Sequence, residues 1–366
     1  MQSPNTLYIA RLDHLRALAA FMVFFFHIRL YTMTALPGSI LSKIPIIEQG
    51  HAGVSLFMVI SGFILAHIVG SAEIDVPRFY LNRALRIYPL FVLVVALGYF
   101  ATPDPRPVSA GTDFLMALLP ISNLYRLHYG LYGGALWSIA VELQFYLLFP
   151  ILYRQLRERG WVGFAIVLSM LVALRGIAYL TTGTVHQLAY FSLFGGLDAF
   201  VFGFIAHAAY TRLNGRRLPV WSPILAIALV VILLDVAFRH QSFFHVDYNR
   251  VGTDGISKSA LWIVWPTIQA AAFAALVATY LSAAPLGFGS RLSDMAAWFG
   301  KISYSLYVWH IAVILICLPR MQDIRGVGLY AAGLFLMVVC ILVSAGSYYV
   351  IERPFLKYRV RYLKAE

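Results

Sequence analysis

The stretch 53–70 reads GVSLFMVISGFILAHIVG and contains no Lys, Arg, Asp or Glu. Because a bilayer core about 30 Å thick is crossed by about 20 helical residues, a run of this length and composition predicts a membrane-spanning helix. Similar apolar runs, bounded by charged residues or by Pro and Gly, recur along the whole chain. They give ten predicted spans, at 17–35, 53–70, 88–101, 136–153, 161–180, 191–210, 219–238, 260–282, 299–318 and 327–351. The sequence therefore predicts an all-α, polytopic membrane protein with a single membrane domain over 1–366.

The composition of the chain supports this fold class. Of its 366 residues, 61% are hydrophobic and 12% are charged, whereas a soluble domain is typically about 25% charged. This composition excludes a soluble globular protein. The net charge of +12 does not indicate a nucleic-acid partner, because a basic face that binds a duplex needs a water-exposed surface that this composition does not supply. We expect membrane lipids, and no nucleic acid, among the partners of the protein.

The positive charge is distributed unevenly between the two sides of the predicted bundle. With ten spans, both termini lie on one side, and 18 of the 28 Lys and Arg residues fall there, mostly in short loops. Because short loops rich in Lys and Arg are retained in the cytoplasm, both termini are predicted to be cytoplasmic. The opposite side has the longer connections, 36–52, 102–135 and 239–259, where an outward-facing binding site would be built.

Arg16 and His27 lie in the first span, within LDHLRALAAFMVFFFH. An ionisable side chain inside a span costs at least about 2.5 kcal/mol on insertion scales, so each one is a functional candidate. The spacing is close to three helical turns, which puts both side chains on one helix face about 16 Å apart. Arg16 is then at the cytoplasmic lip and His27 near the middle of the membrane. The alternative is a snorkelling Arg16 and a His27 that is hydrogen-bonded to a neighbouring helix.

Arg83 and Arg86 lie in RFYLNRALRIYP, a segment that leads into the third span. Their i, i+3 spacing puts both guanidinium groups on one helix face. Together with Arg16 they form a predicted cytoplasmic cluster that suits phosphates, because a guanidinium binds phosphoryl oxygens bidentately. Binding of lipid headgroups and setting of the topology explain the same residues equally well.

Two further spans carry polar groups. Glu142 lies in WSIAVELQFY, where a carboxylate stays protonated, pairs with a cation of another helix or transfers protons. A structural ion pair is as consistent with the sequence as catalysis. In GKISYSLYVWH, a polar stripe at i, i+4 and i+7 is formed by Ser303, Tyr307 and His310. Hydrogen bonding between helices is the simplest explanation of that stripe.

No motif of the sequence indicates a metal or nucleotide site. A GxSxG elbow, a Walker A motif and an HExxH motif are all missing, and the ten His residues are scattered. Cys317 and Cys340 lie in apolar runs, which argues against a disulfide or a Cys-based zinc site. We therefore expect no metal.

The order of these motifs resembles that of the acyltransferase-3 family of integral membrane acyltransferases. The matching elements are, in order, R-x10-H at Arg16 and His27, GVSLFMVISGF, R-x-x-R at Arg83 and Arg86, WSIAVELQFY, GKISYSLYVWH and a closing IERP. The similarity covers about 12–354. Each motif alone is weak, but six of them in this order are highly specific. The residues that depart from the usual family pattern are His14, His51 and Gln144.

The resemblance implies transfer of an acyl group, usually acetyl, from cytoplasmic acyl-coenzyme A to a hydroxyl of a glycan outside the bacterial cytoplasmic (inner) membrane. Acetyl-coenzyme A is then the expected donor and an exported glycan the expected acceptor. Carried over position by position, the functional arginine–histidine pair falls on Arg16 and His27, the essential arginine motif on Arg83 and Arg86, the acid of W-S-x-x-x-E on Glu142, and the end of S-Y-S-x-Y-x-x-H on His310. Some members carry an extra soluble esterase-like domain. We expect the stand-alone type, which acylates its acceptor directly or passes the group to a separate protein.

The three arginines are expected to hold the phosphates of coenzyme A. The predicted catalytic residues are His27, Glu142 and His310. Of these, His27 is expected to act as the base that activates the acceptor hydroxyl, oriented by Glu142 or by a tyrosine. Direct attack by the hydroxyl and an acyl-enzyme relay are both open, although the direct route needs fewer steps. A homo-oligomer is compatible with the sequence.

Two other classes of protein are alternatives. A proton-coupled transporter of a lipid-linked glycan or small solute would use intramembrane His and Glu residues as a proton relay. Such a transporter would show an inverted repeat or matched broken spans, and the sequence has no clear pair of this kind. A membrane acyltransferase of another architecture would use one intramembrane His, but it would leave the R-x10-H and R-x-x-R elements unexplained.

Overall fold

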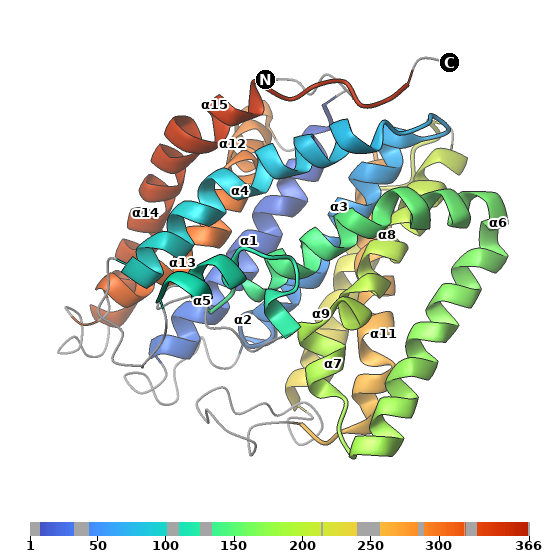
Figure 1. Ribbon diagram of the computed structural model, residues 1–366, viewed down its shortest axis with the longest axis horizontal. Helices are drawn as coiled ribbons and strands as arrows, with labels where there is room; N and C mark the ends of the chain where they lie inside the picture. Colours follow the sequence, from blue (N-terminus) through green and yellow to red (C-terminus); the bar gives the residue numbers. More distant parts are fainter. Residues whose placement is uncertain are drawn as a thin grey trace.

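The protein, described here by a computed structural model, is a bundle of helices (Figure 1). The described residues are 8–32, 44–100, 110–124, 134–213, 215–239, 257–284, 289–317, 319 and 328–364. The longer helices are α1 (Ala10–Thr32), α3 (Gly53–Val69), α4 (Val76–Phe100), α6 (Trp137–Thr182), α8 (Leu193–Arg212), α9 (Trp221–Arg239), α11 (Trp265–Ser282), α12 (Ser290–Lys301), α13 (Ser303–Cys317) and α14 (Gly328–Ser347). The shorter ones are α2 (Pro45–Glu48), α5 (Ala110–Ala117), α7 (His186–Phe191) and α15 (Arg353–Leu356), with a 3-10 turn η2 (Gly50–Ala52) and a π-helical segment η7 (Tyr348–Glu352). Within these residues only isolated β-bridges occur, so the all-α fold class is confirmed.

Several helices are long and apolar enough to cross a membrane. In the described part of the chain six pass on length and composition, and there are seven if the pair α12 and α13, bent by 64° at their junction, is one span. The six are Gly50–Val69, Val76–Phe100, Trp137–Thr182, Leu193–Arg212, Trp221–Arg239 and Ala331–Leu356. The number of ten spans is therefore not confirmed, and the cytoplasmic placement of the termini stays a prediction.

Helix α6 explains part of the difference in span number. It has 46 residues, about 69 Å at 1.5 Å per residue, which is more than twice the thickness of a bilayer core. Gly160 has φ 55° and ψ −141°, a backbone conformation that interrupts the helix and that glycine adopts without strain. The predicted runs 136–153 and 161–180 lie on the two arms on either side of this break. Figure 1 shows the later arm running along the outside of the bundle.

Helices α3 and α8 cross closely in the core, because glycines lie at their contact. A Cβ atom at Gly62 would lie 2.2 Å from the carbonyl oxygen of Phe200, and one at Gly203 would lie 2.3 Å from that of Val59. The first arm of α6 packs on the same helix α8, where the ring of Phe145 stacks on that of Phe200 with a centroid distance of 3.6 Å. This packing brings α3 and the first arm of α6 to opposite sides of one cavity.

A buried ion pair ties the later arm of α6 to α8. Arg175 Nη2 lies 2.9 Å from Asp198 Oδ2, and both side chains are fully buried. Thr267 of α11 donates a hydrogen bond to the same carboxylate and accepts one from Arg175 at 2.9 Å. Breaking such a pair leaves an uncompensated buried charge, so these three residues fix how α6, α8 and α11 pack.

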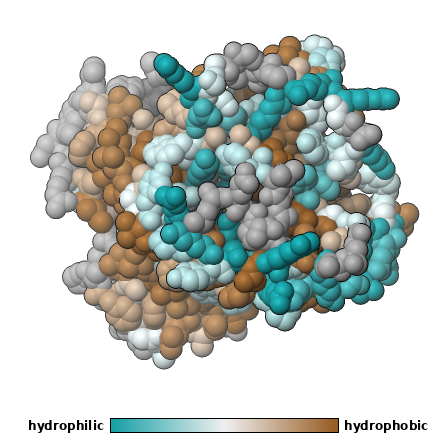
Figure 2. Space-filling model, turned by 90° about the horizontal axis from the view of Figure 1, so that it is seen from above, coloured by the Kyte–Doolittle hydropathy of each residue, from teal (hydrophilic) through white to brown (hydrophobic). Residues whose placement is uncertain are grey.

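The chain beyond α15 runs back over the start of α4. Asn82 donates from Nδ2 to the Val360 carbonyl at 2.7 Å and accepts from the Val360 N–H at 2.9 Å. Ile74 and Leu363 form an antiparallel bridge. This return holds Arg359 at the end of the bundle where α1 begins and α15 ends, which we call the polar end (Figure 1). Figure 2 shows hydrophilic side chains gathered on this end, with hydrophobic ones around its edge.

Candidate active site

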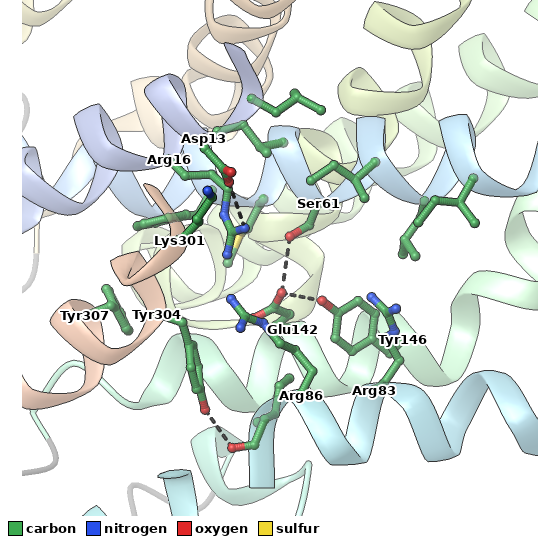
Figure 3. Close-up of a pocket in the computed structure, with 18 of the residues that line it drawn as sticks. Asp13, Arg16, Ser61, Arg83, Arg86, Glu142, Tyr146, Lys301, Tyr304 and Tyr307 are labelled. Atoms are coloured by element: carbon green, nitrogen blue, oxygen red, sulfur yellow. Dashed lines mark hydrogen bonds and ion pairs between the residues drawn. The ribbon is translucent and has the colours of Figure 1, made fainter. Parts of the chain in front are cut away.

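A cavity of about 320 Å³ opens between α1, α3, α4, the first arm of α6 and the α12–α13 pair (Figure 3). Its polar lining includes Asp13, Arg16, Ser61, His67, Arg83, Arg86, Ser138, Glu142, Tyr146, Lys301, Tyr304, Tyr307 and Arg359. Apolar residues of α3, Ile60, Ile64 and Ile68 among them, line one wall. The cavity therefore combines a charged region with an apolar wall inside the bundle.

The structure brings the three predicted arginines, Arg16, Arg83 and Arg86, to this one cavity. It adds two cations that the sequence did not single out, Lys301 and Arg359. Among the described lining residues these five cations face two carboxylates, so the cavity favours anions. No spacing in the sequence could indicate Arg359, because its position depends on the return of the C-terminal segment over α4.

A close contact between α1 and α12 positions Lys301. A Cβ atom at Gly300 would lie 2.0 Å from the carbonyl oxygen of Asp13, so a larger residue would push the two helices apart. Asp13 also lies 3.4 Å from Arg16 Nη1, which is a long ion pair. The glycine of GKISYSLYVWH thus places Lys301 beside the start of α1.

Arg86 is held by a buried carboxylate. Its Nη1 lies 2.7 Å from Glu352 Oε2, and the Glu352 side chain is only 1% exposed. Ser305 of α13 donates a hydrogen bond to the other carboxylate oxygen, and the Arg86 guanidinium lies over the Tyr304 ring, 5.2 Å from its centroid. Glu352 belongs to the IERP motif, but nothing in the sequence singled it out as the partner of Arg86. Arg86 therefore has a structural task as well as a place in the cavity wall.

Arg83 has no such carboxylate partner among the described residues. Its guanidinium lies between two aromatic rings, 5.5 Å from the centroid of Phe79 and 5.4 Å from that of Tyr146. Its Nε is buried without a hydrogen-bond partner in the described part of the chain. Since buried donors normally have partners, this geometry leaves Arg83 able to bind an anion in the cavity.

Glu142 faces α3 across the cavity. Its Oε1 accepts hydrogen bonds from Ser61 Oγ at 3.2 Å and from Tyr146 Oη at 2.5 Å, as Figure 3 shows. The carboxylate thereby fixes the Tyr146 ring, on which Arg83 packs. Glu142 therefore lies with the arginine cluster. His27 instead contacts the side chain of His310.

His27 and His310 form a pair. His310 Nε2 lies 3.1 Å from His27 Nδ1, and His27 Nδ1 also lies 2.9 Å from the Val23 carbonyl oxygen. His310 Nδ1 lies 2.5 Å from the Tyr307 carbonyl oxygen. Because a carbonyl oxygen only accepts, each Nδ1 carries its hydrogen, and His310 Nε2 accepts from His27. A neutral His27 then has its basic lone pair on Nε2.

Tyr307 connects this histidine pair to the cavity. It lines the cavity, and its ring centroid lies 5.6 Å from that of His310. Its hydroxyl lies 2.6 Å from both Ser138 Oγ and the Ala135 carbonyl oxygen. The two histidines are not among the described residues that line the cavity, so Tyr307 and Ser138 form the boundary between the cavity and the pair.

The described residues offer no metal site, since no group of three or more His, Cys, Asp or Glu side chains converges among them. The arrangement that they do offer has two parts. One is a cationic cavity at the polar end, and the other is the His27–His310 pair deeper in the bundle. An anionic substrate held by the first part would have its remote end directed toward the second.

An apolar bundle of helices with a cationic cavity and a histidine pair fits a membrane enzyme that acts on an anionic substrate, and a comparison with known families narrows the class. The profile of the acyltransferase domain matches residues 9–346, so the chain belongs to the acyltransferase-3 family and the resemblance seen in its motifs is confirmed. The chain is 26% identical over 341 residues to O-acetyltransferase OatA of Staphylococcus aureus, covering 86% of this chain and 51% of that protein. It is 25% identical over 386 residues to the putative peptidoglycan O-acetyltransferase YrhL of Bacillus subtilis, covering 95% and 55%.

A third relative is of similar length. The putative acetyltransferase ORF330 of Acidianus two-tailed virus is 26% identical over 323 residues, which is 83% of each chain. The chain spans about half the length of the two bacterial relatives. No solved structure matches the chain significantly.

Proposed function

We propose that this protein is a membrane O-acyltransferase that moves an acetyl group from acetyl-coenzyme A to a hydroxyl of a glycan outside the bacterial cytoplasmic membrane. The observation that carries the proposal is the cavity in which Arg16, Arg83 and Arg86 converge, next to the His27–His310 pair. The relatives support it, because two of them are named as O-acetyltransferases and one of those names includes peptidoglycan.

The cations of the cavity would bind the phosphates of coenzyme A. Arg83 and Arg359 present guanidinium groups that can bind phosphoryl oxygens bidentately. Burial lowers the pKa of Arg359, and the neighbouring guanidinium groups of Arg86 and Arg83 lower it further, to about 10. Arg359 remains charged near neutral pH, and a bound anion would relieve the repulsion that its neighbours exert. The apolar wall of α3 suits the uncharged pantetheine arm.

The histidine pair would carry out the proton transfer. His27 Nε2 takes the proton of the acceptor hydroxyl, and the hydroxyl oxygen attacks the carbonyl carbon of the thioester. The new ester C–O bond forms, the C–S bond breaks, and the proton on His27 passes to the leaving thiolate of coenzyme A. His310 holds the His27 ring in the tautomer that this step requires. Tyr307 has to move aside for the thioester to reach His27.

Arg83→Ala should weaken binding of acetyl-coenzyme A about tenfold to a hundredfold, because a hydrogen bond between charged groups contributes about 1.5–3 kcal/mol. Isothermal titration calorimetry on the purified protein in detergent measures this affinity. The matched control is Arg154→Ala, since Arg154 is an exposed arginine that pairs with Glu158 and does not line the cavity. If Arg83→Ala binds the donor as tightly as the control, the phosphate role of the cavity is wrong.

The activity itself is tested with purified protein and acetyl-coenzyme A radiolabelled in the acetyl group. An acyltransferase hydrolyses the thioester slowly in the absence of an acceptor and transfers label to an added glycan. A transporter leaves the thioester intact. Absence of both hydrolysis and transfer by a folded preparation would overturn the proposed function.

A further inference from the structure

A row of aromatic and imidazole rings continues from the histidine pair to α7 and the start of α6. Figure 1 shows α7 on the side of the bundle away from the polar end. The ring of Phe26 lies 5.0 Å from that of His27 and 5.2 Å from that of His51. His51 lies 5.2 Å from Tyr190, and Tyr190 lies 5.1 Å from Trp137, all as centroid distances. The row thus joins α1, η2, α7 and the start of α6. His51, Tyr190 and Trp137 are each half-buried.

Two histidines of this region have buried nitrogens without hydrogen-bond partners in the described part of the chain. His186 is fully buried, its ring stacks on Tyr190 at 5.8 Å and 14°, and neither of its ring nitrogens has such a partner. His51 Nδ1 is buried without one, while its Nε2 lies 3.1 Å from Gln49 Oε1. Buried polar atoms in native proteins are almost always satisfied, so unsatisfied ones gathered beside half-buried rings indicate a polar ligand.

Two oppositely charged described residues lie near the start of this row. Arg29 of α1 and Glu48 of α2 form an ion pair, with side chains 18% and 6% exposed. Among the described residues, this surface carries a pair with no net charge, whereas the cavity at the polar end is lined by five cations and two carboxylates. The surface suits an uncharged ligand that combines an apolar face with hydrogen-bonding groups.

We propose that Trp137, Tyr190 and His51 form a subsite for a pyranose ring of the acceptor glycan, an assignment that rests on the proposed function. A pyranose presents one face of C–H groups, which pack on the negative face of an aromatic ring, and a rim of hydroxyls, which hydrogen-bond to imidazole nitrogens and amides. The row of rings ends at His27, the proposed base. A sugar on Tyr190 and His51 therefore lies on the side of His27 that faces away from the cationic cavity. The donor and the acceptor then approach the histidine pair from opposite ends of the bundle.

Tyr190→Ala tests this subsite through the dependence of the transfer rate on acceptor concentration. The probe is a linear tetramer of N-acetylglucosamine, with acetyl-coenzyme A held at saturation. The KM for the tetramer should rise about tenfold, because the variant lacks the tyrosine ring on which the sugar packs. The KM for acetyl-coenzyme A and the slow hydrolysis without acceptor should not change. Tyr190→Phe keeps the ring and should stay within about twofold of the unaltered protein.

The control and the second variant use residues of the same region. Phe194→Ala removes an aromatic ring that is 46% exposed at the start of α8, outside the row, and should leave the KM for the tetramer unchanged. His51→Ala should raise that KM as Tyr190→Ala does.

The outcomes separate the subsite from the function on which it rests. An unchanged KM for the tetramer in Tyr190→Ala, or an equal rise in Tyr190→Phe, overturns the subsite. Loss of donor hydrolysis in Tyr190→Ala also overturns the subsite, because the Tyr190 ring is then needed to maintain the fold rather than to bind the sugar. If the unaltered protein hydrolyses acetyl-coenzyme A but never labels the tetramer, the pyranose assignment is wrong while the donor site stands. If it does neither, the proposed function itself fails.

Discussion

His27→Ala should lower the rate of acyl transfer by about a hundredfold to ten-thousandfold, which is the usual contribution of a general base. The expectation follows from the geometry of the pair. Nδ1 of His27 is hydrogen-bonded to the Val23 carbonyl oxygen at 2.9 Å and to His310 Nε2 at 3.1 Å, so Nε2 of His27 is the atom that can accept a proton. The measurement is the initial rate of label transfer from acetyl-coenzyme A to glycan, with the affinity for the donor determined in parallel.

Two matched histidine variants accompany this measurement. His207→Ala removes a half-buried imidazole that packs on Phe63 at 5.5 Å, away from the pair, and should leave the rate nearly unchanged. His310→Ala should lower the rate less than His27→Ala, since it removes a residue that positions the base rather than the base itself. Near-normal transfer by His27→Ala would contradict the mechanism, and a larger loss in His310→Ala than in His27→Ala would reverse the two roles.

Much of the cationic cavity could be predicted from the sequence, because its signals are local. Arg83 and Arg86 are three residues apart on one helix, and Arg16 lies near the start of the first apolar run, so all three come near one end of a helical bundle. Their convergence on one cavity agrees with that expectation. The contributions of Lys301 and Arg359 could not be predicted, since these depend on the contact of α12 with α1 and on the return of the C-terminal segment.

Pairings between distant residues are the part that one sequence does not reveal. His27 and His310 were each candidates because they are ionisable groups in apolar runs, but their contact spans 283 positions and depends on the packing of α1 on α13. The buried pair of Arg175 and Asp198 was missed, although the same signal was present. Both residues lie within predicted spans, 161–180 and 191–210, where a charge needs a partner.

The count of spans shows a similar limit. Runs of apolar residues predicted helices throughout the described chain, and helices are present there. Hydropathy alone does not decide whether an apolar helix crosses a bilayer, bends or packs inside the protein. Gly160 in α6 and the 64° bend between α12 and α13 are decided by backbone conformation and by contacts with neighbours.

Arg86→Ala should destabilise the fold by about 3–5 kcal/mol, the usual cost of removing one partner of a buried ion pair. The Glu352 carboxylate, 1% exposed, would lose the guanidinium 2.7 Å away and keep the hydrogen bond from the Ser305 side chain. Thermal or denaturant unfolding in detergent measures the change. Arg83→Ala is the matched control on the same helix and cavity, and it should cost less than about 2 kcal/mol, because its guanidinium packs on rings rather than pairing with a buried carboxylate.

The double variant Arg86→Ala with Glu352→Gln separates the structural task of Arg86 from its proposed role in donor binding. An amide in place of the carboxylate removes the uncompensated charge and still accepts from Ser305, so most of the lost stability should return. Affinity for acetyl-coenzyme A should not return, because the cavity still lacks one cation. If Glu352→Gln restores donor binding along with stability, Arg86 acts on the donor only by maintaining the fold. If it restores neither, the buried pair is not what makes Arg86 necessary.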